Sequence, residues 1–229
     1  MDGVAWRERG LVRFIGRTLE DEFNDIARSL GGDVSGREAG DDYLLTTNAL
    51  YRGRPVSWAL TPKIFDEAQF DILKDAAETM GRIMGRVTRR FMRDGRFRRL
   101  FRLSPALEEL CLTPTGYKAP IPIARVDLFL DEKTGDYTFC ELNTDGSTGM
   151  TTTVEVTRAV QRTETYRQLL RNHPELRVRS LDPTGAVIDA ILATYEEWAR
   201  ARAADVGSAG ADHPAMAIVD YSESASFEE

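Results

Sequence analysis

The stretch IPIARVDLFLDEKTGDYTFCELN, residues 121–143, decides the fold of this chain. Apolar and polar side chains alternate over 121–130 and again over 137–143, which is the pattern of strands with one buried face. The polar connection between them contains Gly135, and glycine suits the left-handed residue of a type I turn followed by a bulge. The sequence therefore predicts an antiparallel hairpin whose loop is 133–135.

The register of this hairpin follows from the predicted loop. With that loop, Glu132 pairs with Asp136, and every other pair follows by counting. Side chains on a strand alternate between its two faces, so several opposed pairs share one face of the hairpin. These pairs are Arg125 with Asn143, Asp127 with Glu141, and Phe129 with Phe139. The intervening residues should point into an apolar layer, so Cys140 is predicted to be a small core residue.

Two opposed carboxylates on such a hairpin need a physical reason, because opposed Cβ atoms lie about 4.5–5.5 Å apart and like charges repel there. A shared proton, Arg125 or a divalent cation could relieve the repulsion between Asp127 and Glu141. The two acids and Asn143 offer oxygen ligands on one face, a set that Mg2+ completes with water and with nucleotide phosphates. The sequence predicts such a site, with Arg125 holding a phosphate or a developing oxyanion. The alternative is a hairpin whose charged side chains only keep it solvated.

A loop rich in glycine and hydroxyl side chains follows the second strand. Gly146 and Gly149 allow the backbone to approach a ligand closely. Ser147 and Thr148 offer hydroxyl groups beside them. The order Thr-Thr-Val-Glu over 152–155 predicts a capping box, and the helix that it begins would present amide groups to a carboxylate or phosphate. A turn that only caps the helix is the alternative.

The runs RVDLFLD at 125–131 and ELNTD at 141–145 carry a family resemblance. They resemble the arginine-x-aspartate and glutamate-x-asparagine strands of the glutathionylspermidine synthase family, which are circularly permuted ATP-grasp ligases. The resemblance implies an enzyme that uses ATP to activate a substrate carboxylate as an acyl phosphate, which an amine attacks to form an amide. It implies ATP and Mg2+ as cofactors, and a small-molecule or peptide carboxylate and an amine as substrates.

The same resemblance implies a role for each motif residue. Arg125 would be the catalytic residue, stabilising the acyl phosphate and the tetrahedral intermediate. The implied metal ligands are Asp127, Glu141 and Asn143. The implied substrate-binding residues are Ser147 and Thr148, with Gly146 beside them. Where the family usually has Ala-Asp-Thr-Pro after the asparagine, this chain has Thr-Asp-Gly-Ser, so the acid and the amine stay unidentified.

Helical spacing of apolar residues predicts the flanking elements. The predicted helices are 10–30, 65–92, 104–112, 154–170 and 182–202, with short extended segments at 43–45 and 56–60. The fold class is therefore mixed α/β (α+β), with helices flanking a hairpin-containing sheet. By resemblance it would be part of an ATP-grasp-like ligase.

Three regions follow along the chain. Residues 1–202 would form an N-terminal α+β region that holds the substrate and metal site, and 203–214 would form a linker. Residues 215–229 would begin a second, pre-ATP-grasp-like unit with a buried strand at 215–220. Because that strand has little sheet to join, we expect the sequence to be the N-terminal part of a longer ligase that is inactive alone.

Composition excludes several classes of protein. The 229 residues are 42% hydrophobic and 29% charged, which is typical of a globular protein. A formal charge of −7 argues against a nucleic-acid partner. The sequence shows neither a secretory signal nor an apolar run long enough to span a membrane. With only two cysteines and no metal-ligand spacing, we expect a cytoplasmic protein with reduced thiols.

Two alternatives to the ligase remain. A hydrolase could use the same carboxylates, either with a metal ion that activates water or as a glycosidase-like acid–base pair, although neither His173 nor His213 accompanies them in the sequence. A non-enzymatic module could bind an anion through the stretch from Arg82 to Arg102, which contains nine arginines and one acid. A solvated helix face explains that stretch as well.

Overall fold

The computed structural model describes residues 18–144, 148–206, 214–217 and 219, and the chain is helix-rich with two small antiparallel sheets. The helices are α1 (Leu19–Ser29), α2 (Val34–Leu44), α3 (Glu67–Arg93), α4 (Gly95–Arg98), α5 (Pro105–Leu112), α6 (Met150–Val160), α7 (Glu164–Asn172) and α8 (Pro183–Val206). A 3-10 turn covers Arg99–Phe101, and the strands are β1 (Leu50–Tyr51), β2 (Arg54–Pro55), β3 (Arg125–Leu130) and β4 (Tyr137–Asn143). This architecture agrees with the mixed class predicted from the sequence.

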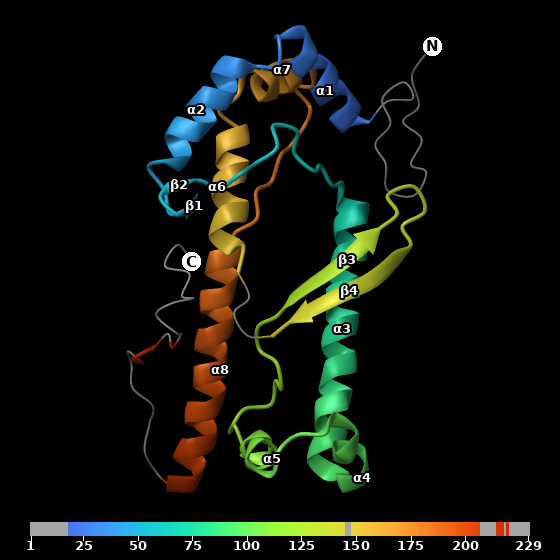
Figure 1. Ribbon diagram of the computed structural model, residues 1–229, viewed down its shortest axis with the longest axis vertical. Coiled ribbons are helices and arrows are strands. Elements are labelled where there is room, and N and C mark those ends of the chain that lie inside the picture. Colours follow the sequence, from blue (N-terminus) through green and yellow to red (C-terminus); the bar gives the residue numbers. More distant parts are fainter. Residues whose placement is uncertain (1–17, 145–147, 207–213, 218, 220–229) are drawn as a thin grey trace.

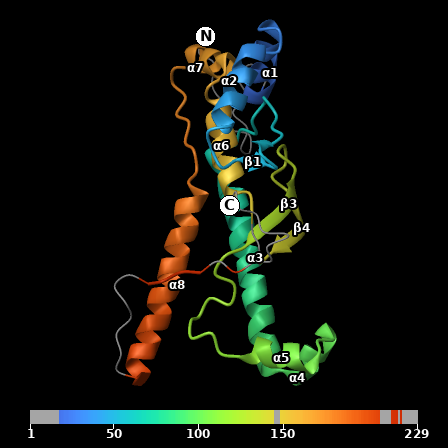
Figure 2. The same ribbon diagram turned by 60° about the vertical axis from the view of Figure 1, so that its left-hand side comes forward.

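The elements are arranged as an upper lobe with two long helices below it (Figure 1, Figure 2). The upper lobe contains α1, α2, α6 and α7. Helix α8 continues below α6, and α3 descends separately with the β3–β4 hairpin beside it. Helices α4 and α5 lie at the lower end of α3. Among the described residues, no helix has the combination of length and apolar character that crossing a membrane requires.

The hydrophobic core lies in the upper lobe, where α1, α2, α6 and α7 meet. Its buried cluster consists of Phe23, Ile26, Leu44, Ala49, Trp58, Ala159, Val160 and Leu169. Polar contacts support this packing: Trp58 Nε1, in the segment after β2, donates to Asp41 Oδ1 on α2 at 2.7 Å, and the Tyr43 hydroxyl on α2 donates to Glu155 on α6. The apolar faces of α1, α2, α6 and α7 therefore form one buried unit.

The break between α6 and α7 differs from the single helix predicted over 154–170. Helix α6 ends at Val160, and the buried Thr163 caps α7, its Oγ1 accepting from the amide of Tyr166 at 3.1 Å. Asp33, at the start of α2, accepts from both the amide and the hydroxyl of Thr165 at 2.7 Å. This contact spans more than 130 residues of sequence, so helical periodicity could not reveal it.

Two other local predictions were wrong. The residues expected to be extended at 43–45 form the end of α2 and its cap, because Leu44 is buried in the core from a helix. Residues 56–60 follow β2 without forming a strand, and Trp58 packs against α2 instead. In the segment predicted as a strand at 215–220, the described residues 215–217 and 219 belong to no strand.

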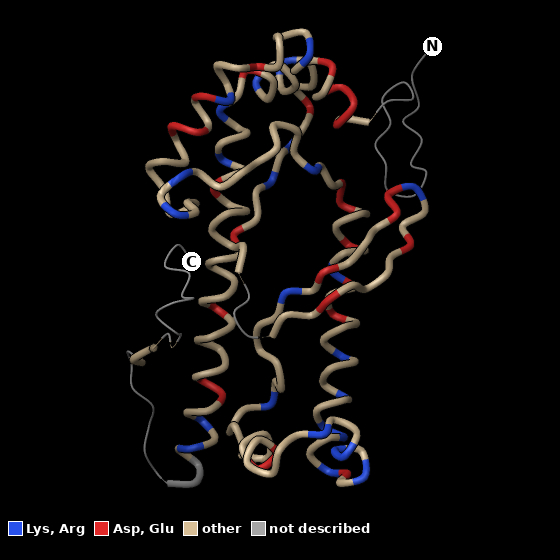
Figure 3. The backbone as a smooth tube through the Cα atoms, in the orientation of Figure 1, with Lys and Arg blue, Asp and Glu red and all other residues tan. Residues whose placement is uncertain are grey.

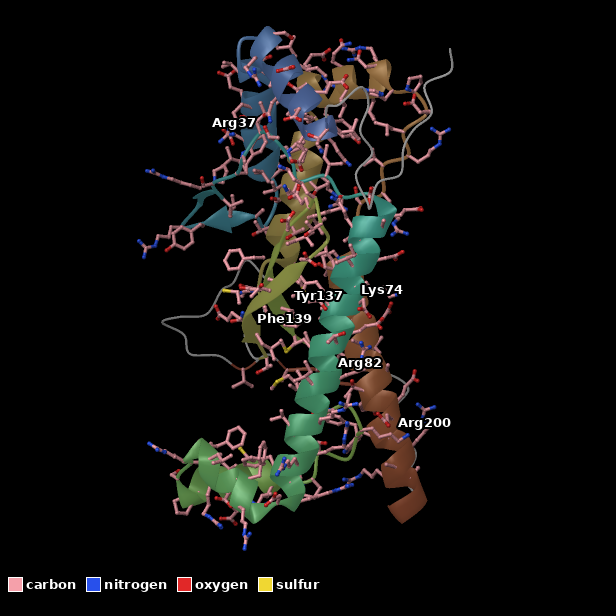
Figure 4. All side chains as sticks on the ribbon, turned by 90° about the vertical axis from the view of Figure 1, so that its right-hand side faces the viewer. Arg37, Lys74, Arg82, Tyr137, Phe139 and Arg200 are labelled. Atoms are coloured by element: carbon pink, nitrogen blue, oxygen red, sulfur yellow. The ribbon has the colours of Figure 1, made fainter. Side chains whose placement is uncertain are left out.

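The β3–β4 hairpin rests against α3 through its loop. A side chain at Gly135 would come within 2.9 Å of Ile72 Cδ1, so the loop approaches α3 closely. Lys63, in the segment before α3, forms an ion pair with Glu132 in the loop. The rings of Tyr137 and Phe139 lie 5.3 Å apart on the hairpin, beside α3 (Figure 4). The loop end of the hairpin therefore contacts both α3 and the segment before it.

The loop of this hairpin is one residue longer than predicted. Asp131 donates its amide to the Asp136 carbonyl at 2.8 Å, which leaves 132–135 as the loop. The Asp131 carboxylate accepts from the amides of Lys133 and Thr134 at 2.8 and 3.2 Å and so closes the turn earlier. Gly135 has φ +77°, the left-handed conformation predicted for it.

A β-bulge compensates for the longer loop. The register shifts between Asp127 and Leu128, and Cys140 is the extra residue on β4. Phe129 therefore pairs with Thr138, and the predicted pairing with Phe139 is wrong. Cys140 is exposed, which contradicts its predicted place in the core, because the bulge turns it out of the apolar layer.

Candidate functional site

The end of the hairpin away from its loop brings four polar residues of the predicted site onto one face. Arg125 pairs with Asn143, and Asp127 pairs with Glu141, as predicted. The bulge lies on the loop side of these two pairs, so they keep the register that the sequence implied. The side chains of Arg125 and Asp127 are 43% and 37% exposed. The two carboxylates are therefore neither buried in a core nor placed on opposite sides of the sheet.

The Arg125 guanidinium joins the parts of this site. Its Nε donates to Asp127 Oδ1 at 3.0 Å, and its Nη1 donates to the Thr148 carbonyl at 3.3 Å. The same Nη1 lies 3.5 Å from the Thr148 hydroxyl oxygen. One arginine on β3 thus holds the Asp127 carboxylate and the segment that leads into α6.

Asn143 links the arginine to the second carboxylate. With its amide oriented so that both ends are satisfied, the Asn143 nitrogen donates to Glu141 Oε1 at 3.1 Å. The Asn143 oxygen then accepts from Arg125 Nη2 at 3.0 Å. Each carboxylate therefore has its own donor, Arg125 for Asp127 and Asn143 for Glu141. Neutralisation by Arg125, one of the three ways of relieving the carboxylate repulsion, is present in this structure.

The start of α6 is built differently from the prediction. The helix begins at Met150, and its N-cap is Gly149, with φ +103° and no capping hydrogen bond from a side chain. The capping box predicted over 152–155 is absent because those residues lie inside the helix. Glu155 instead accepts from the Tyr43 hydroxyl and from Arg158, the latter at 2.7 Å. It belongs to the packing of α2 on α6 and not to the site.

Only part of the predicted substrate loop can be placed. Thr148 lies beside Arg125, which belongs to the cross-strand pair Arg125–Asn143 next to Asp127–Glu141. Gly146 and Ser147, also predicted to bind substrate, lie outside the described residues. Sequence reasoning missed the carbonyl of Thr148 as the group that orients Arg125. A backbone carbonyl carries no residue-specific signal, so this contact could not be found from side-chain types.

The oxygen ligands of the hairpin suit Mg2+ that arrives with a nucleotide better than a metal ion held by protein ligands alone. Within the described ranges, no cluster of three or more histidine, cysteine, aspartate or glutamate side chains could hold a metal ion. The hairpin offers two carboxylates and one amide oxygen. Mg2+ typically takes one or two carboxylates and completes its shell with water and substrate phosphates. The residues present therefore fit a magnesium ion that arrives with a nucleotide, and they do not form an all-protein metal centre.

Comparison of the chain with family models, with curated proteins and with solved structures found no match. The geometry of the hairpin is therefore the main basis for assigning this site.

Proposed function

We propose that this chain carries the magnesium-nucleotide site of an ATP-dependent carboxylate-amine ligase of the ATP-grasp type, similar to the glutathionylspermidine synthase family. One observation supports this proposal above the others. Asp127 and Glu141 are opposed on an accessible face of a hairpin, and Arg125 and Asn143 share that face. Sequence and structure agree on these four positions although the hairpin loop is longer than predicted and the register shifts between Asp127 and Leu128.

The roles of the residues follow from their chemistry. Asp127, Glu141 and Asn143 would hold Mg2+, which when bound offsets the negative charge of the nucleotide phosphates. Asp127 would exchange its ion pair with Arg125 for the metal. The guanidinium released in this way could then donate to a phosphoryl oxygen, with the Thr148 carbonyl still orienting it.

The proposed reaction joins a carboxylate and an amine at the expense of ATP. A carboxylate oxygen takes the γ-phosphoryl group, which gives an acyl phosphate and ADP. The amine then attacks the carbonyl carbon, phosphate leaves, and the amide remains after loss of a proton. Arg125 is placed to stabilise the negative charge that develops on the phosphoryl and carbonyl oxygens.

Thermal unfolding of the full chain tests the proposal through nucleotide binding. ATP with Mg2+, at about ten times its dissociation constant, should raise the unfolding midpoint by about 3–5 °C. The shift should disappear with EDTA and in the variants Asp127→Asn and Glu141→Gln. As matched controls, Asp136→Asn on the same hairpin and Glu109→Gln on α5 remove one negative charge each at exposed positions and should keep the shift.

The other outcomes separate the alternatives. An equal shift with Mg2+ alone would favour the metal-dependent hydrolase, because a hydrolytic site must hold its metal without a nucleotide. A shift with Mg2+ and ATP that persists in both Asp127→Asn and Glu141→Gln would place the nucleotide elsewhere and contradict the proposal.

A further inference from the structure

A groove on α3 lies outside the proposed ligase site. It has a volume of about 520 Å³, and its lining residues are Glu78, Gly81, Arg82, Gly85, Arg86, Arg89 and Pro120. All but Pro120 belong to α3, at spacings of three and four residues, which places them along one side of the helix. Pro120, from the segment before β3, forms the opposite wall. Figure 4 labels Arg82 on α3, below Lys74.

Two glycines give this groove its floor. Gly85 is buried, and a side chain there would lie 3.3 Å from Arg89 Nη1 and 3.8 Å from Pro120 Cγ. The Arg89 guanidinium therefore reaches back over Gly85 toward Pro120, as long side chains on a helix do. A side chain at Gly81 would meet nothing within 4 Å, so the groove is open at that position.

The charges lining the groove are unbalanced. Arg82 has two acidic neighbours, Glu78 and Asp75, each at 3.6 Å. The side chains of Arg86 and Arg89 are exposed and form no ion pair or hydrogen bond with any residue that the structure describes. Glu78 is the only acid among the lining residues, so the three arginines leave the groove with a net positive charge.

The surroundings reinforce this positive charge. Residues 82–102 contain nine arginines and one aspartate, a net charge of +8, while the whole chain has a charge of −7. The rest of the chain therefore carries −15, and the basic residues are concentrated at the lower end of α3 and in α4 (Figure 3). Such a concentration raises the local potential for anions although the molecule as a whole is acidic.

We propose that the α3 groove binds a small phosphorylated molecule that carries at least two negative charges. Guanidinium groups bind phosphate oxygens through paired hydrogen bonds, and Arg86 and Arg89 are the groups available to do so. A volume of about 520 Å³ matches ligands of metabolite or nucleotide size. A nucleic acid is the less favoured ligand, because the chain as a whole has a formal charge of −7 and would repel a long polyanion outside the groove. This proposal does not depend on the ligase function.

Calorimetric titration of the full chain with inorganic pyrophosphate tests the groove. The double variant Arg86→Ala/Arg89→Ala should weaken binding by about 100-fold or more, since each arginine contributes charged hydrogen bonds. The variant Gly81→Leu should weaken it similarly without changing the charge, because its side chain fills the open part of the groove. Leucine is a better helix former than glycine, so this variant should fold at least as well as the original chain.

Two matched controls make the result specific. Arg96→Ala/Arg99→Ala removes the same charge from exposed arginines outside the groove and should change the affinity by less than about 3-fold at 0.15 M salt. With EDTA present, which removes the metal that the proposed ligase site needs, pyrophosphate should still bind to the groove, so failure of the ligase proposal would not affect this one.

Three results would overturn the proposal. The first is no binding of pyrophosphate to the original chain. The second is binding that Gly81→Leu leaves intact. The third is binding of a single-stranded oligonucleotide that exceeds the binding of pyrophosphate and falls equally in both double arginine variants, because that result would indicate a general polyanion surface.

Discussion

The upper lobe and the β3–β4 hairpin use polar side chains in opposite ways. In the upper lobe Asp33 is 2% exposed, and its carboxylate accepts hydrogen bonds from Gly36 and Thr165. On the hairpin, Arg125 and Asp127 bond to each other while 43% and 37% of their side chains remain exposed. The buried polar side chains of the upper lobe, Asp33 and Thr165 among them, are engaged in hydrogen bonds that hold its helices together. On the hairpin, we expect Arg125 and Asp127 to exchange their hydrogen bonds for contacts with a ligand while the free energy of unfolding changes little.

The comparison of the upper lobe with the hairpin predicts that substitutions in the two regions will have very different effects. Substitutions in the upper lobe should lower the free energy of unfolding, and those on the hairpin should affect binding. The four predictions below test this contrast, from the largest expected effect to the smallest.

Phe23→Ala should destabilise the chain most. Phe23 is fully buried in the core, so the change removes apolar contacts and leaves a cavity, with an expected loss of about 3–5 kcal/mol in the free energy of unfolding. Urea denaturation measures the loss. Phe129→Ala is the matched control on the hairpin, where the ring is 71% exposed and the expected change is within about 0.5 kcal/mol. Equal losses of unfolding free energy in Phe23→Ala and Phe129→Ala would contradict the predicted difference between the upper lobe and the hairpin.

Asp33→Ala should lower the free energy of unfolding by about 2–4 kcal/mol. The change removes the cap of α2 and leaves the buried amide and hydroxyl of Thr165 without their acceptor. It also places alanine at φ 49°, where a side chain is strained. Asp182→Ala removes an exposed acceptor at the start of α8 and should cost only about 1 kcal/mol, measured in the same way. A similar loss in both variants would mean that the link between α2 and α7 adds nothing.

His173 should make the stability of the upper lobe depend on pH. Its Nε2 lies 2.7 Å from Glu22 Oε2, and this carboxylate raises the pKa of His173 above its usual value. The folded chain therefore holds the proton more tightly than the unfolded chain. The resulting stabilisation is complete below about pH 6.5, the ordinary value for histidine, and is lost as the pH rises through the folded pKa.

His173→Gln should remove this pH dependence. The difference in unfolding free energy between the original chain and the variant should shrink from pH 6 to pH 8, by less than about 1 kcal/mol for a single ion pair. Urea denaturation at several pH values measures it, and Glu22→Gln should give the same profile. If the difference in unfolding free energy grew with pH, the predicted direction of the pH dependence would be wrong.

Asp127→Asn should have the smallest effect on stability. The ion pair with Arg125 is partly exposed, so its removal should change the free energy of unfolding by no more than about 0.5 kcal/mol. The variant should nevertheless lose protection by Mg2+ and ATP. A destabilisation above about 2 kcal/mol would instead identify Asp127 as a structural residue like Asp33.

Local patterns in the sequence were sufficient for the elements that depend on neighbouring residues. The long α3, the short α5 with Ser104 as its cap, and most of α8 agree with the predicted helices. The pairing of Asp127 with Glu141 across the hairpin was also predicted correctly, although the loop and the register near it differ from the prediction. The turn formed by Asp131 lengthens the loop, and the bulge at Cys140 offsets the change before the site is reached.

Contacts between distant segments decided the rest. The division of 150–172 into α6 and α7 involves Asp33, more than 130 residues from Thr165. The orientation of Arg125 involves Asn143 on β4 and the backbone of Thr148 ahead of α6. Periodicity and capping act over a few residues, so the amino-acid sequence alone determined helices such as α3, α5 and α8, the existence of the hairpin, and the shared face of Arg125, Asp127, Glu141 and Asn143. Burial and hydrogen bonding between distant segments depend on packing, so only the tertiary structure decided where α6 ends and what Arg125 holds.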